Sequence, residues 1–378
     1  MAKLGEVCLI NPKSCTLRDD TEVSFIPMTK VGEHGEFDAS EIKNYSEVKK
    51  GFTNFQNGDI LFAKITPCME NGKGAIAHNM KNGIGFGSTE FHVLRPDTDK
   101  ITSEWLYYLT TWKTFRKEAE RNMTGSAGQK RVPKTFLENY VVNLPDIDTQ
   151  KSENKILRKV DDLIFLRKQQ LAKLDELVKA RFVEMFLLHD YPTKTLDELS
   201  IGKGEYGAQS ASTEYNPSRP RYVRITDVND DGTLNDNCVS SENISDDAQY
   251  KLSYGDFMFA RMGATVGKTY AFLSGNQIFA GYLIRYKLNL SLVNPRYLFW
   301  YTKLDEYQTW VKLNQSGAAQ PGINAKKYGS LKIPVPPIEL QNQFATFVAR
   351  IDQQRQTVQK SLEKLELMKK ALMQEYFS

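Results

Sequence analysis

The residues best suited to hold a nucleotide phosphate form the stretch MGATVGKT at positions 262–269. A phosphate-binding loop needs a glycine, four further residues and then Gly-Lys, so that backbone N–H groups surround the phosphate. Position 262 is methionine, and counting from Gly263 leaves one residue too few. A related stretch at Lys73 continues with Gly74 rather than with serine or threonine. We therefore favour a tight turn between two strands over a nucleotide site.

Two acidic residues and a lysine near the middle of the chain could in principle hold a catalytic metal ion. Asp146, Glu153 and Lys155 have the residue types of a nuclease site. Their spacing is short for such a site, and Glu153 and Lys155 fall on the first turns of a predicted helix. The positions 191 residues later carry proline, phenylalanine and threonine instead. Coincidence is the better interpretation of this pattern.

A third stretch, Asn-Pro-Arg-Tyr at residues 294–297, comes close to the Asn/Asp-Pro-Pro-aromatic loop of an adenine methyltransferase. It lacks the second proline. Four cysteines lie scattered at positions 8, 15, 68 and 238, and no zinc site of standard spacing can be built from them and the four histidines. We expect reduced thiols in a cytoplasmic protein, with no catalytic residue, no metal site and no cofactor.

Composition indicates a soluble globular protein of two or three domains, because the chain has 378 residues, 40% of them hydrophobic and 25% charged. The net charge of +4 is compatible with an acidic polymer as partner but does not argue for one. The first residues lack the apolar core of a signal peptide. No apolar run reaches 18 residues, so we expect no membrane span.

Two long helices must position the stretches at 146–155, 262–269 and 294–297. Residues 150–186 contain no glycine or proline, and their apolar residues recur at alternating three- and four-residue steps, which predicts a heptad seam. At about 1.5 Å per residue the helix would be roughly 55 Å long, and it needs a partner to bury that seam. We expect it to be capped by Asp148 or Thr149 and to end near Asp190. Its seam residues are Leu157, Val160, Ile164, Leu171, Leu174 and Val178.

The partner helix lies 191 residues later in the same chain. The corresponding seam residues are Val348, Ile351, Val358, Leu362, Leu365 and Leu372. Four seam positions carry basic residues, Arg167 and Arg181 in the first helix and Arg355 and Lys369 in the second; Arg167 and Lys369 stand within the seam. Such side chains can extend from the edge of a seam into solvent, or they can select one alignment of the two helices. We expect the helices to pack antiparallel.

The segments before the two helices also repeat each other. GDILFAK at 58–64 corresponds to GDFMFAR at 255–261, and TGSAGQ at 124–129 corresponds to QSGAAQ at 315–320. We predict strands at 24–28, 60–65 and 90–94, and a helix at 103–121. The expected domains are 1–148, a globule; 149–190, a long helix; 191–338, a second globule; and 339–378, a second long helix. The fold class is α+β, with two pseudo-twofold-related globules.

This order of motifs resembles the specificity subunit of type I DNA restriction-modification systems, over essentially the whole chain. The glycine-rich segment followed by QKRVP at 129–133, and IPVPPIELQ at 333–341, add to the resemblance. It implies two target-recognition domains that read a split, asymmetric sequence in double-stranded DNA. It also implies assembly with two methyltransferase subunits, and with restriction subunits in the full complex. The subunit itself has no catalytic activity in this family.

Contacts with DNA would come from basic side chains on loops, with phosphate contacts giving position and base edges giving sequence. Lys64 and Arg261 occupy equivalent strand ends, where the alternative is a charge in solvent. Lys268, in the stretch 262–269, and Lys73, in the related stretch, could lie on loops that face DNA phosphate. Gln129 is matched by Gln320 and more plausibly serves the fold. The remaining candidates are Lys130 and Arg131 in the glycine loop and Arg219, Arg221 and Arg224 in the second globule.

We therefore predict a non-catalytic subunit that binds a bipartite DNA site and recruits methyltransferase. Two alternatives remain open. One is a repeat-built scaffold that binds proteins only, which a failure to bind randomised duplexes would favour. The other is a nucleotide-dependent enzyme, which nucleotide titration would decide. The sequence predicts neither half-site nor the spacer between them.

Overall fold

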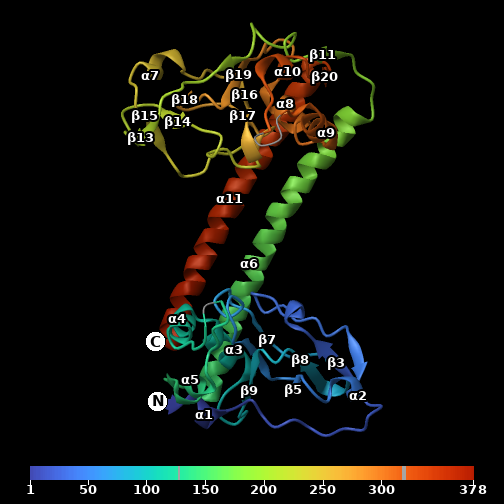
Figure 1. The fold of residues 1–378 in the computed structure, drawn as a ribbon, viewed down its shortest axis with the longest axis vertical. Coiled ribbons are helices and arrows are strands. Elements are labelled where there is room, and N and C mark those ends of the chain that lie inside the picture. Colours follow the sequence, from blue (N-terminus) through green and yellow to red (C-terminus); the bar gives the residue numbers. More distant parts are fainter. Residues whose placement is uncertain (127, 317–320) are drawn as a thin grey trace. The chain divides into compact units, whose positions relative to one another are not determined.

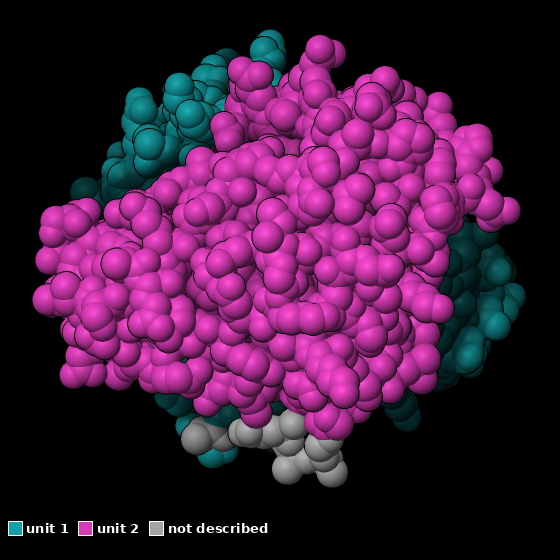
Figure 2. All heavy atoms as spheres, turned by 90° about the horizontal axis from the view of Figure 1, so that it is seen from above, with its two compact units in different colours: residues 1–168, 360–378 teal, residues 169–359 magenta. Residues whose placement is uncertain are grey.

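The computed structural model describes residues 1–126, 128–316 and 321–378. The chain divides into two compact units, which Figure 2 colours separately. Unit 1 comprises residues 1–168 and 360–378, and unit 2 comprises residues 169–359. Each unit contains one globule and a part of each of two long helices, α6 (Ile147–Phe182) and α11 (Ile338–Phe377) (Figure 1).

Unit 1 contains two four-stranded sheets. One has the order β2-β9-β6-β7 and is antiparallel, and the other has the order β4-β3-β8-β5, in which β3 and β8 are parallel. β1 pairs with β10. The strands are β1 (Ala2–Lys3), β2 (Cys8–Ile10), β3 (Glu22–Ile26), β4 (Ile42–Asn44), β5 (Thr53–Gln56), β6 (Ile60–Ala63), β7 (Gly74–Ile76), β8 (Ile84–Gly87), β9 (Phe91–Pro96) and β10 (Val141–Val142). The helices are α1 (Leu4–Val7), α2 (Tyr45–Val48), α3 (Ser103–Thr111), α4 (Lys113–Arg121) and α5 (Lys134–Asn139).

Unit 2 repeats the first of these sheets at the same size and has two-stranded pairs in place of the second. Its four-stranded antiparallel sheet has the order β12-β19-β16-β17, and β14 and β18 form a parallel pair. β13 pairs with β15, and β11 pairs with β20. The strands are β11 (Thr193–Thr195), β12 (Glu205–Tyr206), β13 (Ser212–Glu214), β14 (Arg221–Val223), β15 (Val239–Ser241), β16 (Asp256–Ala260), β17 (Thr269–Ala271), β18 (Gln277–Phe279), β19 (Leu283–Lys287) and β20 (Lys332–Pro334). The helices are α7 (Asp246–Gln249), α8 (Pro295–Tyr301), α9 (Asp305–Asn314) and α10 (Ala325–Gly329).

The repeated sequence 58–64 forms the central strand of unit 1. Gly58 has a φ of +90°, which suits the turn that begins β6 and explains the glycine at this position. Because side chains alternate along a strand, Ile60 and Phe62 pack with the helices of the globule, whereas Leu61 and Ala63 pack toward the other sheet. All four are fully buried. β16 of unit 2 has the same arrangement, with Gly255 at a φ of +89°.

The two long helices pack together through the apolar residues of their seams. In unit 1, Lys369 forms an ion pair with Asp161, and Arg167 donates a hydrogen bond to Ser361. Between these two contacts the residue number increases on α6, from 161 to 167, and decreases on α11, from 369 to 361. The two helices therefore run antiparallel. Buried positions are Leu157, Val160, Leu174, Val178, Val348, Ile351, Val358 and Leu362, and half-buried positions are Ile164, Leu171, Leu365 and Leu372. The α+β prediction with two globules and two long helices is confirmed. Among the described residues, no helix is long and apolar enough to cross a membrane.

Two local predictions were wrong. The cap of α6 is Asp146, not Asp148 or Thr149, because the helix begins at Ile147 and the Asp146 carboxylate accepts hydrogen bonds from the backbone N–H groups of Asp148 (3.0 Å) and Thr149 (2.9 Å). These bonds, led by that of Thr149, lower the pKa of Asp146. The helix predicted at 103–121 is divided into α3 and α4, since the backbone at Trp112 is extended.

Aromatic side chains join each globule to its part of the long helices. In unit 1, Phe377 packs against Trp105, with ring centroids 4.8 Å apart. In unit 2, Tyr297 of α8 packs against Phe182 and Phe186, with ring centroids 5.5 and 4.8 Å apart, and Phe344 of α11 packs edge-on against the same two rings, at 5.3 and 5.4 Å. Phe344 is fully buried. These contacts place the helices within the cores of the globules rather than on their surfaces.

We expect Phe344→Ala to lower the free energy of unfolding of unit 2 by about 3–5 kcal/mol, since it removes a buried ring and leaves a cavity. Native-state hydrogen exchange of the unit 2 amides would measure this, because a chain with two units need not unfold in one step. The matched control is Leu313→Ala on α9 of the same unit, where the side chain is 78% exposed; we expect a change within about 0.5 kcal/mol. Equal losses for the two variants would contradict this account of the core.

Candidate functional site

Lys64 and Arg261 occupy the same place in the two globules. Each directly follows the central strand, β6 or β16. The Lys64 N–H donates to the carbonyl of Glu90 (2.9 Å), and the Lys64 carbonyl accepts from the N–H of Val132 (2.9 Å). Arg261 makes the corresponding bonds with Tyr282 (3.0 Å) and Ile323 (2.9 Å). The backbone therefore fixes both residues at the end of the central strand, and only the surroundings of their side chains differ.

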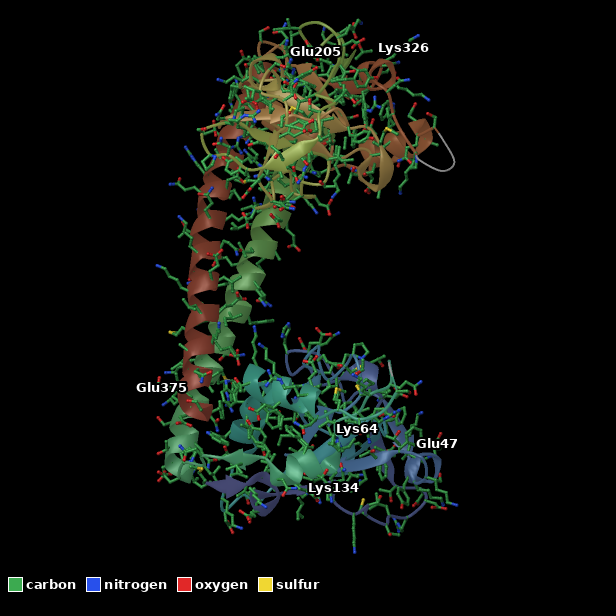
Figure 3. The ribbon with its side chains drawn as sticks, turned by 60° about the vertical axis from the view of Figure 1, so that its left-hand side comes forward. Glu47, Lys64, Lys134, Glu205, Lys326 and Glu375 are labelled. Atoms are coloured by element: carbon green, nitrogen blue, oxygen red, sulfur yellow. The ribbon has the colours of Figure 1, made fainter. Side chains whose placement is uncertain are left out.

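In unit 1, the surroundings of Lys64 are ionic. Arg131 forms a two-pronged ion pair with Glu90, with Nε and Nη2 each 2.9 Å from a carboxylate oxygen. Burial lowers the pKa of Lys64, the positive charge of Arg131 lowers it further, and Glu90 opposes both effects. Burial also lowers the pKa of His92, whose Nε2 lies 2.7 Å from the Val132 carbonyl. Lys64 is thus a partly desolvated charge at the strand end; Figure 3 labels it together with Lys134 of α5.

In unit 2, the surroundings of Arg261 are aromatic. The guanidinium carbon lies 4.8 Å from the ring centroid of Tyr206 and 5.9 Å from that of Tyr282. Its Nη2 lies 3.5 Å from Sδ of Met262. Nε is covered and has no hydrogen-bond partner among the described residues. Sequence reasoning missed both tyrosines. Alignment of the repeats could have found Tyr282, which takes the place of Glu90, but no sequence signal pointed to Tyr206.

The glycine loop of unit 1 closes over the strand end. Thr124 and Arg131 exchange two backbone hydrogen bonds (3.0 and 2.8 Å), which join the two ends of the loop. Ala127 and the counterpart residues 317–320, including Gln320, lie outside the part of the chain that the structure describes. Lys130 is exposed and borders a cavity of about 470 Å³. The other lining residues are Glu70, Lys117, Glu120, Arg121 and Met123, so charges of both signs surround the cavity.

Lys73 directly precedes β7 and Lys268 directly precedes β17, and each side chain contacts another segment of its own globule. Lys73 Nζ donates to the carbonyl of Met28 (3.3 Å), and Lys268 forms an ion pair with Asp230 (2.7 Å). Residues Gly263–Thr265 form a 3-10 turn between β16 and β17, which are antiparallel neighbours. The sequence interpretation of this stretch as a tight turn between strands agrees with this geometry.

The three arginines singled out in unit 2 all have acceptors within the chain. Arg219 pairs with Asp247 (2.7 Å), and Arg224 pairs with Asp227 (2.9 Å). Arg221 donates to the carbonyl of Asn235 (2.7 Å). A guanidinium already paired with a carboxylate offers less charge to an outside anion, so these residues are weaker candidates for contact than Arg261.

The other stretches examined for chemistry have structural roles. Asp146 caps α6, and Glu153 accepts a hydrogen bond from Nε1 of Trp105 (2.8 Å). The side chain of Asn294 accepts from the N–H of Arg296 and caps α8. Across the described residues, no group of three or more potential ligands could hold a metal ion.

A second apolar stripe on the long helices was not anticipated. Ile156, Leu163 and Leu166 each precede a seam residue of α6 by one position, and their side chains are 41%, 41% and 53% exposed. Met368 precedes Lys369 on α11 in the same way and is 43% exposed. The heptad pattern contained this signal, since these residues flank the seam at steps of three and seven. Large exposed apolar side chains in a row indicate a surface that binds a partner.

A protein-family model described as the type I restriction modification DNA specificity domain matches residues 1–176 and 189–367. Because the match extends over most of both halves, the chain belongs to this family. Both units carry the strand-end residue and the long-helix segments described above.

Two curated relatives match part of the chain. It is 46% identical over 178 residues to the type I restriction enzyme EcoAI specificity subunit of Escherichia coli, covering 46% of this chain and 30% of that protein. It is 38% identical over 204 residues to the EcoEI specificity subunit of Escherichia coli, covering 52% and 33%. The matched region thus spans about a third of these relatives.

One similar solved structure is described as "Structural basis underlying complex assembly and conformational transition of the type I R-M system". It has a TM-score of 0.61 at 17% identity and covers 99% of this chain and 96% of that one. At this identity the likeness concerns the fold alone.

Proposed function

We propose that this chain is the specificity subunit of a type I restriction-modification complex and that it recognises a bipartite, asymmetric sequence in double-stranded DNA. The observation that carries the proposal is the family match over both halves of the chain. Two globules on one plan, each with a basic residue at the same strand end, suit a site with two different half-sites. The chain supplies sequence recognition and no catalysis.

Recognition would divide between contacts that give position and contacts that give sequence. Lys64, Lys130 and Arg261 are the leading candidates for contact with DNA, because among the described residues their side chains donate to no oxygen atom, whereas Lys73 and Arg221 donate to backbone carbonyls. Lys73, Lys268, Arg131, Arg219, Arg221 and Arg224 would act mainly by shaping the loops around them. Activity on cellular DNA, together with four free cysteines, is consistent with a cytoplasmic protein.

We propose two methyltransferase subunits as partners, with restriction subunits joining in the full complex. The similar solved structure concerns assembly of a type I complex, which supports this expectation. On this chain, the exposed stripe of Ile156, Leu163, Leu166 and Met368 suits an apolar partner helix. We assign this stripe to a methyltransferase subunit.

We expect the double substitution Leu163→Glu and Leu166→Glu to weaken association with the methyltransferase by at least about tenfold, because two charges would have to be desolvated in an apolar contact. Native mass spectrometry of the co-expressed proteins would measure the loss. The control is Phe165→Glu, which places a charge on the same helix one residue after the seam residue Ile164 and so on the other flank. Association lost equally in both variants, or in neither, would contradict the assignment.

Selection from a pool of randomised duplexes tests the proposed function directly. The chain, assembled with its methyltransferase subunits, should enrich duplexes that share two short sequences at a fixed separation. A protein-interaction scaffold would enrich no sequence, and that outcome would reject the proposal. A nucleotide-dependent enzyme is disfavoured because residues 263–269 form a turn between strands.

A further inference from the structure

The guanidinium of Arg261 differs from those of the other arginines expected at the interface. Arg131, Arg219 and Arg224 donate to carboxylates, and Arg221 donates to a backbone carbonyl. Within the described residues, the Arg261 guanidinium donates to no oxygen atom, and its one hydrogen-bond contact is the thioether of Met262. Nε is covered, so the two terminal amino groups of the guanidinium are the donors left for an oxygen or nitrogen acceptor from outside the chain.

Two tyrosine rings hold this guanidinium in position. Tyr206 and Tyr282 are 40% and 54% exposed, so the group lies at the surface and not in the core. The backbone N–H of Ala325, at the start of α10, donates to the Tyr206 hydroxyl (3.2 Å). Contact with ring faces restrains a guanidinium without occupying its donors at the edge. Its orientation is thereby restricted before any ligand arrives, which lowers the entropy cost of binding.

A fixed, planar pair of N–H donors matches one base edge better than any other. In the major groove, guanine presents N7 and O6 as two adjacent acceptors, and arginine binds both at once. Phosphate oxygens also accept two bonds, but a phosphate contact needs no such placement on a rigid strand end. We propose that Arg261 is a specificity-determining residue that reads a guanine in the half-site bound by unit 2, with Tyr206 and Tyr282 as positioning residues. This inference rests on the proposed function.

The equivalent position in unit 1 has a different chemistry. Lys64 carries a compact charge that cannot make two parallel bonds in a plane, and it lies beside the Glu90–Arg131 ion pair rather than between aromatic rings. Lys64 therefore fits a phosphate contact. The same position of the fold would thus contact a base in unit 2 and a DNA phosphate in unit 1. This difference helps two globules with the same fold bind different sequences.

The test compares Arg261→Lys with the parent chain in duplex selection with the assembled complex. Lysine keeps the charge but loses the planar fork, so preference for guanine at a single position of one half-site should fall about 5- to 150-fold. The other half-site should be unchanged. Exchange of residues 1–148 identifies which half-site belongs to unit 2. Arg350→Lys, at an exposed position of α11 in the same unit, is the control and should enrich the parent sequence.

Tyr282→Leu provides a second variant, since it leaves Arg261 intact and alters a side chain that is mostly exposed. It should relax the same guanine position and no other. If Arg261→Lys enriches the parent sequence, or weakens binding equally for all sequences, Arg261 does not read a base. If the parent complex itself enriches no sequence, the proposed function fails instead.

Discussion

Exchange of residues 1–148 for the corresponding globule of another specificity subunit should replace one half-site completely and leave the other unchanged. The reason is that each unit has its own sheets and its own core, and the strand-end residues Lys64 and Arg261 belong to different units. The donor must keep aromatic side chains at the places of Trp105 and Tyr108. Trp105 packs on Phe377, and the Tyr108 hydroxyl donates to Asp161 (3.0 Å), so these two residues join the globule to the helices.

Methylation profiling of cells carrying the exchanged chain with its methyltransferase would measure this result. A control chain in which residues 1–148 are replaced by those of a relative with the same first half-site should leave the whole profile unchanged. An exchange that alters both half-sites would show that the two globules do not read DNA independently.

Raising the salt concentration from 50 to 200 mM should weaken DNA binding by the assembled complex about 10³- to 10⁵-fold. That range corresponds to about 6–10 neutralised phosphates, each of which releases counterions on binding. Fluorescence anisotropy on a specific duplex at several salt concentrations would measure the dependence. A loss of less than about tenfold would mean that phosphate contacts are far fewer than a protein that binds both half-sites requires.

Lys64→Ala should reduce the slope of log affinity against log salt by about 1, as expected for the loss of a single phosphate contact. Binding should weaken about equally for all sequences. Lys173→Ala, at an exposed position of α6, is the matched control and should leave the slope unchanged. A changed sequence preference for Lys64→Ala would mean that Lys64 contacts a base.

The long helices and the central strands could be predicted because each has a periodic signal and an internal copy. Leu157 and Val348, and likewise Phe62 and Phe259, recur in matched sequence surroundings, and burial imposes the same pattern twice. The second stripe, including Leu163 and Met368, was present in the same periodicity. It was not predicted because the prediction considered the seam positions and not the heptad positions beside them.

The details of the site depend on contacts that periodicity does not encode. The pairing of Arg219 with Asp247 and of Arg224 with Asp227 is set by loop conformations, so sequence reasoning could not separate these arginines from Arg261. Tyr206 reaches Arg261 because β12 pairs with β19, a contact across 78 residues of sequence (Tyr206 with Ile284). Likewise, no glycine or proline near Trp112 indicates that the predicted helix is divided there.

The measurement that tests the central claim most directly is the methylation profile of cells carrying this chain with its methyltransferase subunits. Recognition by two different globules predicts methylated sites made of two unlike half-sites at one fixed separation, and no methylation when the chain is absent. A single contiguous site, two identical half-sites, or methylation that does not depend on the chain would contradict the account.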